Sequence, residues 1–286
     1  MVIHDLTDSD FQAFRRLIYE KSGIALNDGK KELLRTRLRS KLEKEGYPSY
    51  RAFFNEVKND ESAGTIVALL DAISTNLTSF FREHSHFDYM RKALPAMIEA
   101  KRKSNDTTLR IWSAGCSSGE EPYTVAFVLL EALGASPGRW EPKILGTDLS
   151  TDVLRRAMEG KYEVEKLSQL PQNVRDKYFT RETGEVVTKS GSILRNRPLA
   201  RISPEVRGMV TFRRLNLMEN FPFKRLFEII FCRNVMIYFD KQTQGVLVNK
   251  FYDALREGGY LFIGHSESLA GLRHGFKYVQ PTIYQK

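Results

Sequence analysis

The chain has 286 residues, of which 42% are hydrophobic, so it is long enough for one large domain with its own core plus a small domain. The two cysteines, Cys116 and Cys232, are too few for a disulfide framework, and no apolar run reaches the length of a membrane span. The first ten residues are acidic and lack the apolar centre of a signal peptide, so we expect a soluble cytoplasmic protein.

The positive charge of the chain, +9 in total, is concentrated in two basic segments. Residues 30–44 carry seven basic residues against two acidic ones, and residues 160–215 carry twelve against six. Such segments suit an acidic protein partner or nucleic acid, and they also suit a simple solvated surface.

Residues 1–75 predict a small bundle of four short helices. Apolar residues recur at helical spacing, and Gly23 and Gly46 end the first two helices. The later helices are expected at Lys30–Glu45, Tyr50–Lys58 and Ser62–Ile73. Basic residues crowd the second helix, where they favour either solubility or docking of an acidic partner helix; they are Arg35, Arg37, Arg39 and Lys41.

Residues 76–90 are interpreted as a connector that leads into a helix over His86–Lys103. Its segment Asn76–Arg82 places two adjacent phenylalanines between polar residues that could reach a ligand. His84 and His86 have no Cys or carboxylate partner at the spacing of metal ligands, so we expect surface or helix-capping roles for both and no metal site.

A short apolar strand beginning at Leu109 leads into a turn of small residues that includes Gly115, and then into a helix opened by Glu120 and Glu121. Small residues let a ligand lie against bare backbone, as in nucleotide pockets at the carboxyl edge of a parallel sheet. The turn lacks the Lys of a P-loop and the third glycine of a dinucleotide fingerprint. Two acids at the start of the helix disfavour a phosphate and favour a ligand with hydroxyls and positive charge, such as S-adenosylmethionine.

The second strand, Lys143–Asp148, ends in an acid about thirty residues after the first strand. Such an acid holds the ribose diol of a bound nucleoside, although Asp148 could instead cap the helix that follows. Strands and helices alternate from Leu109 onward, which predicts a mostly parallel sheet over residues 91–286. Residues 160–209 interrupt that pattern and are interpreted as an insertion, with a hairpin near 184–191. After Cys232, a helix capped by Asp240 is expected to run to about Arg256, ended by Gly258-Gly259, and the chain closes on a pair of strands.

Four segments in order resemble the chemotaxis receptor methyltransferase (CheR) family over essentially the whole chain. They are Asn76–Arg82, Trp112–Tyr123, Cys232–Phe239 and Gly264–Glu267. The resemblance implies a helical receptor-docking domain (1–75) and a Rossmann-like class I methyltransferase domain with an inserted antiparallel β-subdomain. It also implies transfer of a methyl group from S-adenosylmethionine to glutamate side chains of chemoreceptor helices. In some members the β-subdomain binds a receptor C-terminal peptide as an extra strand.

The resemblance also implies roles for individual residues. Asn76, Thr78 and Arg82 would line the cofactor pocket from the connector, and Glu121 and Asp148 would hold the methionyl or ribose portion. On the far side of the pocket, the resemblance assigns Asn216 and Leu217 to the adenine, and it assigns closure of the reaction centre to Arg233, Asn234 and Tyr238.

Methyl transfer to a carboxylate needs positioning and partial desolvation, because the carboxylate is already ionised at neutral pH. We therefore assign Arg82 to orienting the carboxylate or the cofactor, and the Tyr238 hydroxyl to steering the glutamate or the cofactor tail. Two alternatives stay open. One is a methyltransferase of another acidic substrate or of RNA, and the other is a catalytically silent protein that binds S-adenosylmethionine as an adaptor.

Overall fold

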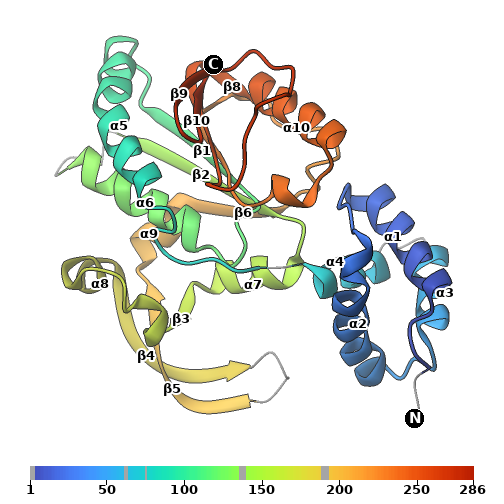
Figure 1. Cartoon of the computed structure of the whole chain (residues 1–286). Coiled ribbons are helices and arrows are strands. Elements are labelled where there is room, and N and C mark those ends of the chain that lie inside the picture. Colours follow the sequence, from blue (N-terminus) through green and yellow to red (C-terminus); the bar gives the residue numbers. More distant parts are fainter. Residues whose placement is uncertain (1–3, 61–63, 75, 135–139, 188–192) are drawn as a thin grey trace.

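The computed structural model describes residues 4–60, 64–74, 76–134, 140–187 and 193–286 (Figure 1). An N-terminal bundle of helices comes first, as predicted: α1 (Asp8–Ser22), α2 (Lys31–Glu45), α3 (Tyr50–Asn59) and α4 (Gly64–Ile73). The expected start of the last of these, Ser62, lies outside the described residues. Leu34, Leu38 and Leu42 of α2 are fully buried in the bundle core, which confirms the apolar stripe read from their spacing. None of the described helices is both long enough and apolar enough to cross a membrane.

The larger domain is built on a seven-stranded sheet in the order β6-β2-β1-β7-β8-β10-β9. The first five of these strands are parallel, and the last two are antiparallel. Their bounds are β1 (Thr108–Ala114), β2 (Glu141–Asp148), β6 (Val210–Arg214), β7 (Phe227–Cys232), β8 (Leu255–Ile263), β9 (Lys277–Gln280) and β10 (Ile283–Gln285). Because β2 and β7 flank β1 on opposite sides, the chain leaves a crevice at the carboxyl end of β1, where α/β proteins bind ligands.

Helices cover both faces of this sheet and create two separate apolar cores. On one face lie α5 (Ser85–Lys103) and α6 (Glu120–Leu133), and on the other lies α10 (Lys241–Ala254) (Figure 1). Neighbouring residues of β1 serve different cores, since Ile111 packs with α5 and α6 whereas Trp112 packs with α10. The mostly parallel sheet predicted from the strand–helix alternation is therefore confirmed.

The insertion forms a second, three-stranded antiparallel sheet in the order β3-β5-β4. It follows α7 (Thr151–Glu159) and comprises β3 (Lys161–Glu163), the short turn η3 (Val164–Leu167), α8 (Gln172–Tyr178), β4 (Phe179–Val187), β5 (Ile193–Ile202) and α9 (Pro204–Met209). This sheet projects away from the main domain at the lower left of Figure 1. Its β4–β5 hairpin is longer than expected, and residues 188–191 of the predicted hairpin lie outside the described residues.

The predicted end of the last helix is wrong, because Gly258 and Gly259 lie inside β8 and α10 already ends at Ala254. The pairing register of β8 with β7 shifts at this point, which marks a bulge. A Cβ on Gly259 would lie 2.8 Å from the carbonyl oxygen of Arg256 and 3.0 Å from that of Glu228. Gly259 therefore permits a close approach of β7 to β8, and Gly258 supplies a φ of +76° at the bulge. The same two residues in sequence are also typical of a helix stop, which is why the prediction was wrong.

The bundle is attached to the main domain beside the carboxyl end of β7. The amide of Ala25 donates to the carbonyl of Tyr238 at 2.8 Å, and Ile24 forms an antiparallel bridge with Phe239. Here Tyr238 belongs to a single 3-10 turn, η4 (Met236–Tyr238). The loop that carries Tyr238 is thereby fixed against the N-terminal domain.

Candidate functional site

A cavity of about 350 Å³ lies between the helical bundle and the carboxyl ends of β1, β2 and β7, a volume typical of small-molecule sites. Segments distant in the sequence meet there, because the bundle, the connector and three strand ends all contribute to its walls. The structure brings all the predicted cofactor and catalytic residues to this one cavity: Asn76, Thr78, Arg82, Gly115, Glu121, Asp148, Asn216, Leu217, Arg233, Asn234 and Tyr238.

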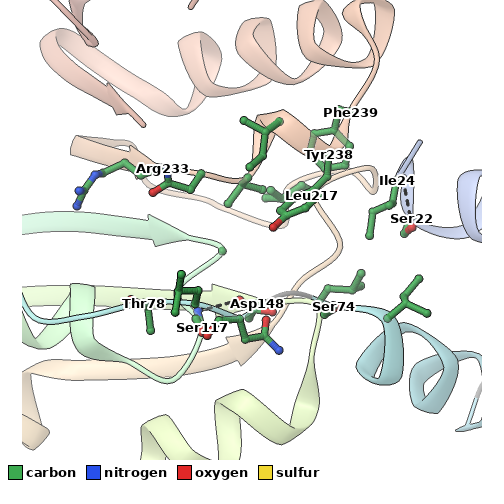
Figure 2. A pocket seen from close by; sticks show the side chains of 18 of the residues that line it. Ser22, Ile24, Ser74, Thr78, Ser117, Asp148, Leu217, Arg233, Tyr238 and Phe239 are labelled. Atoms are coloured by element: carbon green, nitrogen blue, oxygen red, sulfur yellow. Dashed lines mark hydrogen bonds between the residues drawn. The ribbon is translucent and has the colours of Figure 1, made fainter. Parts of the chain in front are cut away.

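The labelled side chains in Figure 2 lie in two rows across this cavity. One row contains Thr78, Ser117, Asp148 and Ser74, and the other contains Arg233, Leu217, Tyr238, Phe239 and Ile24. One side of the cavity is therefore formed by the end of α4, the connector, the turn after β1 and the tip of β2. The facing side is formed by the chain after β6 and β7 and by the segment that follows α1.

The turn after β1 presents bare backbone to the cavity. Gly115 has a φ of +78°, and a Cβ there would lie 2.3 Å from the Val235 side chain, so only glycine fits. The amides of Gly115 and Cys116 both donate to the Thr147 carbonyl, which fixes the turn against β2. Burial raises the pKa of the Cys116 thiol well above its usual range, so this sulfur stays protonated.

Asp148 is held rigidly at the tip of β2. Its two carboxylate oxygens accept from the amides of Ser117 and Ser150, at 2.8 and 2.9 Å. Burial raises the pKa of Asp148, whereas these backbone donors lower it. The alternative that Asp148 caps α7 is wrong, because the N-cap is Ser150, whose hydroxyl accepts from the Val153 amide. The carboxylate can therefore serve a ligand in the cavity.

Glu121 lies in the first turn of α6 and belongs to a buried ionic cluster. One oxygen accepts from the Ser113 hydroxyl at 2.7 Å, and the other lies 3.0 Å from the guanidinium of Arg233. The side chain of Arg233 is only 2% exposed, and it also pairs with Glu83 at 3.0 Å. Burial raises the pKa of Glu121, and the Arg233 charge opposes this rise.

The two predicted catalytic residues approach the cavity from different segments. Arg82 donates to the Leu77 carbonyl at 2.7 Å, which ties its guanidinium to the connector. Tyr238 comes from the loop after β7, and its main chain is fixed by the bond from Ala25. Both can act on a group that enters the cavity, and their catalytic roles stay predictions.

Asn216 stabilises the contact between the domains. Its amide nitrogen donates to the Lys21 carbonyl at 2.7 Å, and its oxygen accepts from the Met218 amide at 3.1 Å. The side chain thus links the end of α1 to the chain after β6. Because both polar atoms already have partners, Asn216 fixes the cavity wall, and its predicted place beside the adenine stays a prediction.

Arg37 does not share an outward face with Arg35 and Arg39. Residues two positions apart do not face each other on a helix, and the guanidinium of Arg37 donates to the carbonyls of Ile73 and Ser74, the latter at 2.8 Å. Arg37 therefore stabilises the end of α4 immediately before the connector.

The other predicted docking residues form ion pairs at the surface of the bundle. Arg35 pairs with Asp5 and Glu32, and Arg39 pairs with Glu43 at 3.0 Å. On α2, Lys41 pairs with Glu45 at 2.6 Å. The Lys41 side chain is only 15% exposed, whereas those of Arg35 and Arg39 are 36% and 55% exposed. Exposed pairs contribute little stability, so Arg35 and Arg39 can most readily exchange their partners for acidic groups of another protein.

Sequence reasoning missed two carboxylates that organise the loop after β7. Glu83 accepts from Arg233 and Asn234, and Glu267 accepts from the amides of Gly264, Asn234 and Ile237 at 2.5, 3.0 and 3.2 Å. Glu83 directly follows the segment Asn76–Arg82, and Glu267 is the last residue of Gly264–Glu267; the family resemblance depends on both segments. The position of Glu83 directly after Arg82, a residue of that motif, was the sequence feature that could have identified it as a site residue.

His86 also has a different environment from the one expected. It is buried, its Nδ1 lies 3.6 Å from Glu83, and Glu83, His86 and His265 bring one ligand atom each to within 4.8 Å of one another. The expectation that His86 has no carboxylate neighbour is therefore wrong. His84 is exposed, as expected.

Comparison with known proteins assigns the chain to a family over nearly its full length. The model of the CheR methyltransferase all-alpha domain matches residues 9–74, and the model of the CheR methyltransferase SAM binding domain matches residues 76–285. A chemotaxis protein methyltransferase from Borreliella burgdorferi is 38% identical over 99% of this chain and 95% of its own length.

Two further relatives have comparable similarity. The chemotaxis protein methyltransferase of Escherichia coli is 36% identical over 98% of this chain and 91% of its own length. Chemotaxis protein methyltransferase 2 of Pseudomonas aeruginosa is 37% identical over 97% of this chain and 93% of its own length. The chain belongs to the CheR methyltransferase family.

Proposed function

We propose that the protein transfers a methyl group from S-adenosylmethionine to glutamate side chains of chemoreceptor cytoplasmic helices, giving methyl esters and S-adenosylhomocysteine. The observation that carries the proposal is the convergence of Glu121, Asp148 and the bare turn at Gly115 on one cavity. The names of the relatives point to the same activity. Such a reaction takes place in the cytoplasm.

The residues around the cavity fit the cofactor. Asp148 is a carboxylate with a fixed orientation, which suits the two hydroxyls of a ribose. Glu121 lies near the Gly115 turn and suits a positively charged amino group. A phosphate would be repelled by these acids, so the site favours a cationic nucleoside over a nucleotide.

The reaction makes few chemical demands on the protein. The cofactor supplies a methyl group on a positively charged sulfur; a glutamate oxygen bonds to that carbon while the carbon–sulfur bond breaks and its electron pair stays on sulfur. A glutamate with an ordinary pKa of about 4.3 is already ionised, so no general base is required. Positioning can supply roughly 7–11 kcal/mol in favourable cases.

Arg82 and Tyr238 are the residues we assign to that positioning. Arg82 orients the incoming carboxylate or the cofactor, and the Tyr238 hydroxyl steers the glutamate. Replacing Tyr238 by Phe keeps the ring that lines the cavity and removes the hydroxyl. We expect a fall in turnover of at least tenfold with cofactor affinity changed less than about threefold. Unchanged turnover would remove Tyr238 from the mechanism.

We further propose a division of labour between the domains. Residues 1–75 dock the receptor through Arg35, Arg39 and Lys41, while Arg37, predicted for the same role, supports the end of α4 instead. Residues 76–90 contribute the connector to the cofactor pocket, and residues 91–286 bind the cofactor. In the inserted sheet, β4 is an edge strand and offers a place for a receptor C-terminal peptide to pair. Titration of such a peptide tests that last point.

A methyl-transfer assay tests the main proposal. The full chain is incubated with radiolabelled S-adenosylmethionine and a receptor cytoplasmic fragment, and the product is treated with mild base. We expect label on the fragment that base releases, as an ester requires. Label on RNA alone would establish a different substrate, and cofactor binding without any transfer would make the protein an adaptor.

A further inference from the structure

Glu83 lies behind the cavity and joins three segments of the chain. Its carboxylate accepts from Arg233 Nε and Nη2 at 3.2 and 3.0 Å, from Asn234 Nδ2 at 3.3 Å, and from the His265 amide at 3.2 Å. These donors come from the loop after β7 and the loop after β8, whereas Glu83 itself lies in the connector. Glu83 is absent from the residues that line the cavity, so it acts through its neighbours.

The backbone around Glu83 is strained. Phe81 and Glu83 have φ values of +51° and +54°, in the left-handed region that side chains other than Gly, Asn and Asp rarely adopt. Asn234, which donates to Glu83, is at +58°. Such conformations persist only where surrounding contacts determine them, and they concentrate at functional sites. The carboxylate of Glu83 supplies those contacts.

The electrostatic consequence concerns Glu121. Arg233 lies between the two carboxylates, 3.0 Å from each, so with both carboxylates ionised the three groups carry one net negative charge. Without Glu83, Arg233 would neutralise Glu121 completely. Burial alone would raise the pKa of Glu83, but Arg233 and the hydrogen bonds lower it below its ordinary value, so Glu83 is charged at neutral pH.

We propose that Glu83 is a positioning residue that engages Arg233 and so keeps the cavity electrically negative toward the cationic cofactor. The proposal rests on the proposed function, because it assigns S-adenosylmethionine to this cavity. It predicts that loss of the Glu83 charge weakens the binding of S-adenosylmethionine, which carries a sulfonium charge, more than the binding of S-adenosylhomocysteine, which does not.

A metal ion at Glu83, His86 and His265 is the competing interpretation of this cluster. The structure argues against it, because both Glu83 oxygens already accept hydrogen bonds and one lies 3.0 Å from the Arg233 guanidinium. A second cation beside that charge would be repelled. Arg233 is the cation that this cluster holds.

Calorimetric titration of the full chain with each of the two ligands tests the proposal. In Glu83→Gln the shape and one acceptor oxygen remain, while the charge and the second acceptor oxygen are lost. We expect affinity for S-adenosylmethionine to fall on the order of tenfold and that for S-adenosylhomocysteine about threefold, so their ratio drops. A purely structural role would weaken both ligands equally, and that result, or unchanged binding of both, overturns the proposal.

Two further variants complete the design. Glu83→Asp keeps the charge, so the ratio of its affinities for S-adenosylmethionine and S-adenosylhomocysteine must stay within about twofold of the parent's ratio. A lower ratio in this variant overturns the proposal even if the Gln variant does not fold. Glu99→Gln on α5 is the matched control, because Glu99 is exposed and lies 4.0 Å from Lys103. A parent protein that binds neither ligand would refute the proposed function itself, a result distinct from an unchanged ratio.

Discussion

The sheet domain and the helical bundle, which meet at the cavity, are held there by different kinds of interaction. The sheet side is built on buried charges, with Arg233 enclosed between Glu83 and Glu121. The bundle side is attached through partly exposed polar contacts, such as the Tyr19 hydroxyl on Asp240 at 2.7 Å. Buried charges are costly to unpair and exposed ones are not, so changes on the sheet side should affect folding and cofactor binding together. Changes on the bundle side should mainly affect substrate recognition.

The strongest test of this contrast is Arg233→Met, which leaves two buried carboxylates without their cation. Breaking a buried pair in this way costs about 3–5 kcal/mol of unfolding free energy, and we expect cofactor binding to be lost as well. Urea denaturation and calorimetry measure the two effects. Arg91→Met is the control, because Arg91 pairs with Asp88 and Glu131 at the surface. Equal losses in both variants would contradict the contrast.

A second test on the sheet side uses pH. Burial, and then the Arg233 charge, lower the pKa of His86 to about 3, whereas an unfolded histidine has a pKa of about 6.5. Between these values the unfolded chain binds the extra proton, so stability falls as pH decreases, by up to about 1.4 kcal/mol per pH unit. Acidic residues also contribute to the dependence of the free energy of unfolding on pH.

The variant His86→Gln should remove that contribution. We expect its free energy of unfolding, measured in urea from pH 7 to pH 4, to depend on pH less steeply than that of the parent by about one proton. His84→Gln is the control, since His84 is exposed and should leave the slope unchanged. Identical slopes in all three proteins would show that His86 takes up its proton in the folded state.

The smallest expected effect distinguishes two arginines of α2 on the bundle side. Arg37→Met removes the donor to the carbonyls of Ile73 and Ser74 and should cost about 1–3 kcal/mol of stability. Arg39→Met removes one exposed ion pair and should cost less than about 0.5 kcal/mol. At a temperature where both variants are folded, receptor methylation should fall in Arg39→Met, which removes a docking cation, and stay near the parent value in Arg37→Met. Equal stability of the two variants would show that the α4 contact of Arg37 contributes nothing.

Much of the fold follows from local patterns. The bundle helices, the strand ending at Asp148, the Ser150 cap of α7 and the Asp240 cap of α10 all agree with the structure, because caps and apolar spacing act over a few residues. The glycine pair in β8 was misread, since a helix stop and a strand bulge use the same residue for different reasons.

The site was predictable as a list of residues but not as a set of contacts. The motif segments identify the residues that line the cavity, since chemistry demands particular residue types at each strand end. The partners of those residues come from distant segments: Glu83 for Arg233, and Lys21 for Asn216. No local pattern specifies such pairs.

The sequence alone is enough to derive the helices, the strands, the acidic strand tips and the family resemblance, because each depends on neighbouring residues or on a short motif. The tertiary structure decided which charges are buried together and which arginines of α2 remain outside. Burial and the distance between charges set the energy of an ion pair, and both exist only once the chain has folded. For that reason Arg37 became part of the framework, and Glu83 became the partner of the cavity's central arginine.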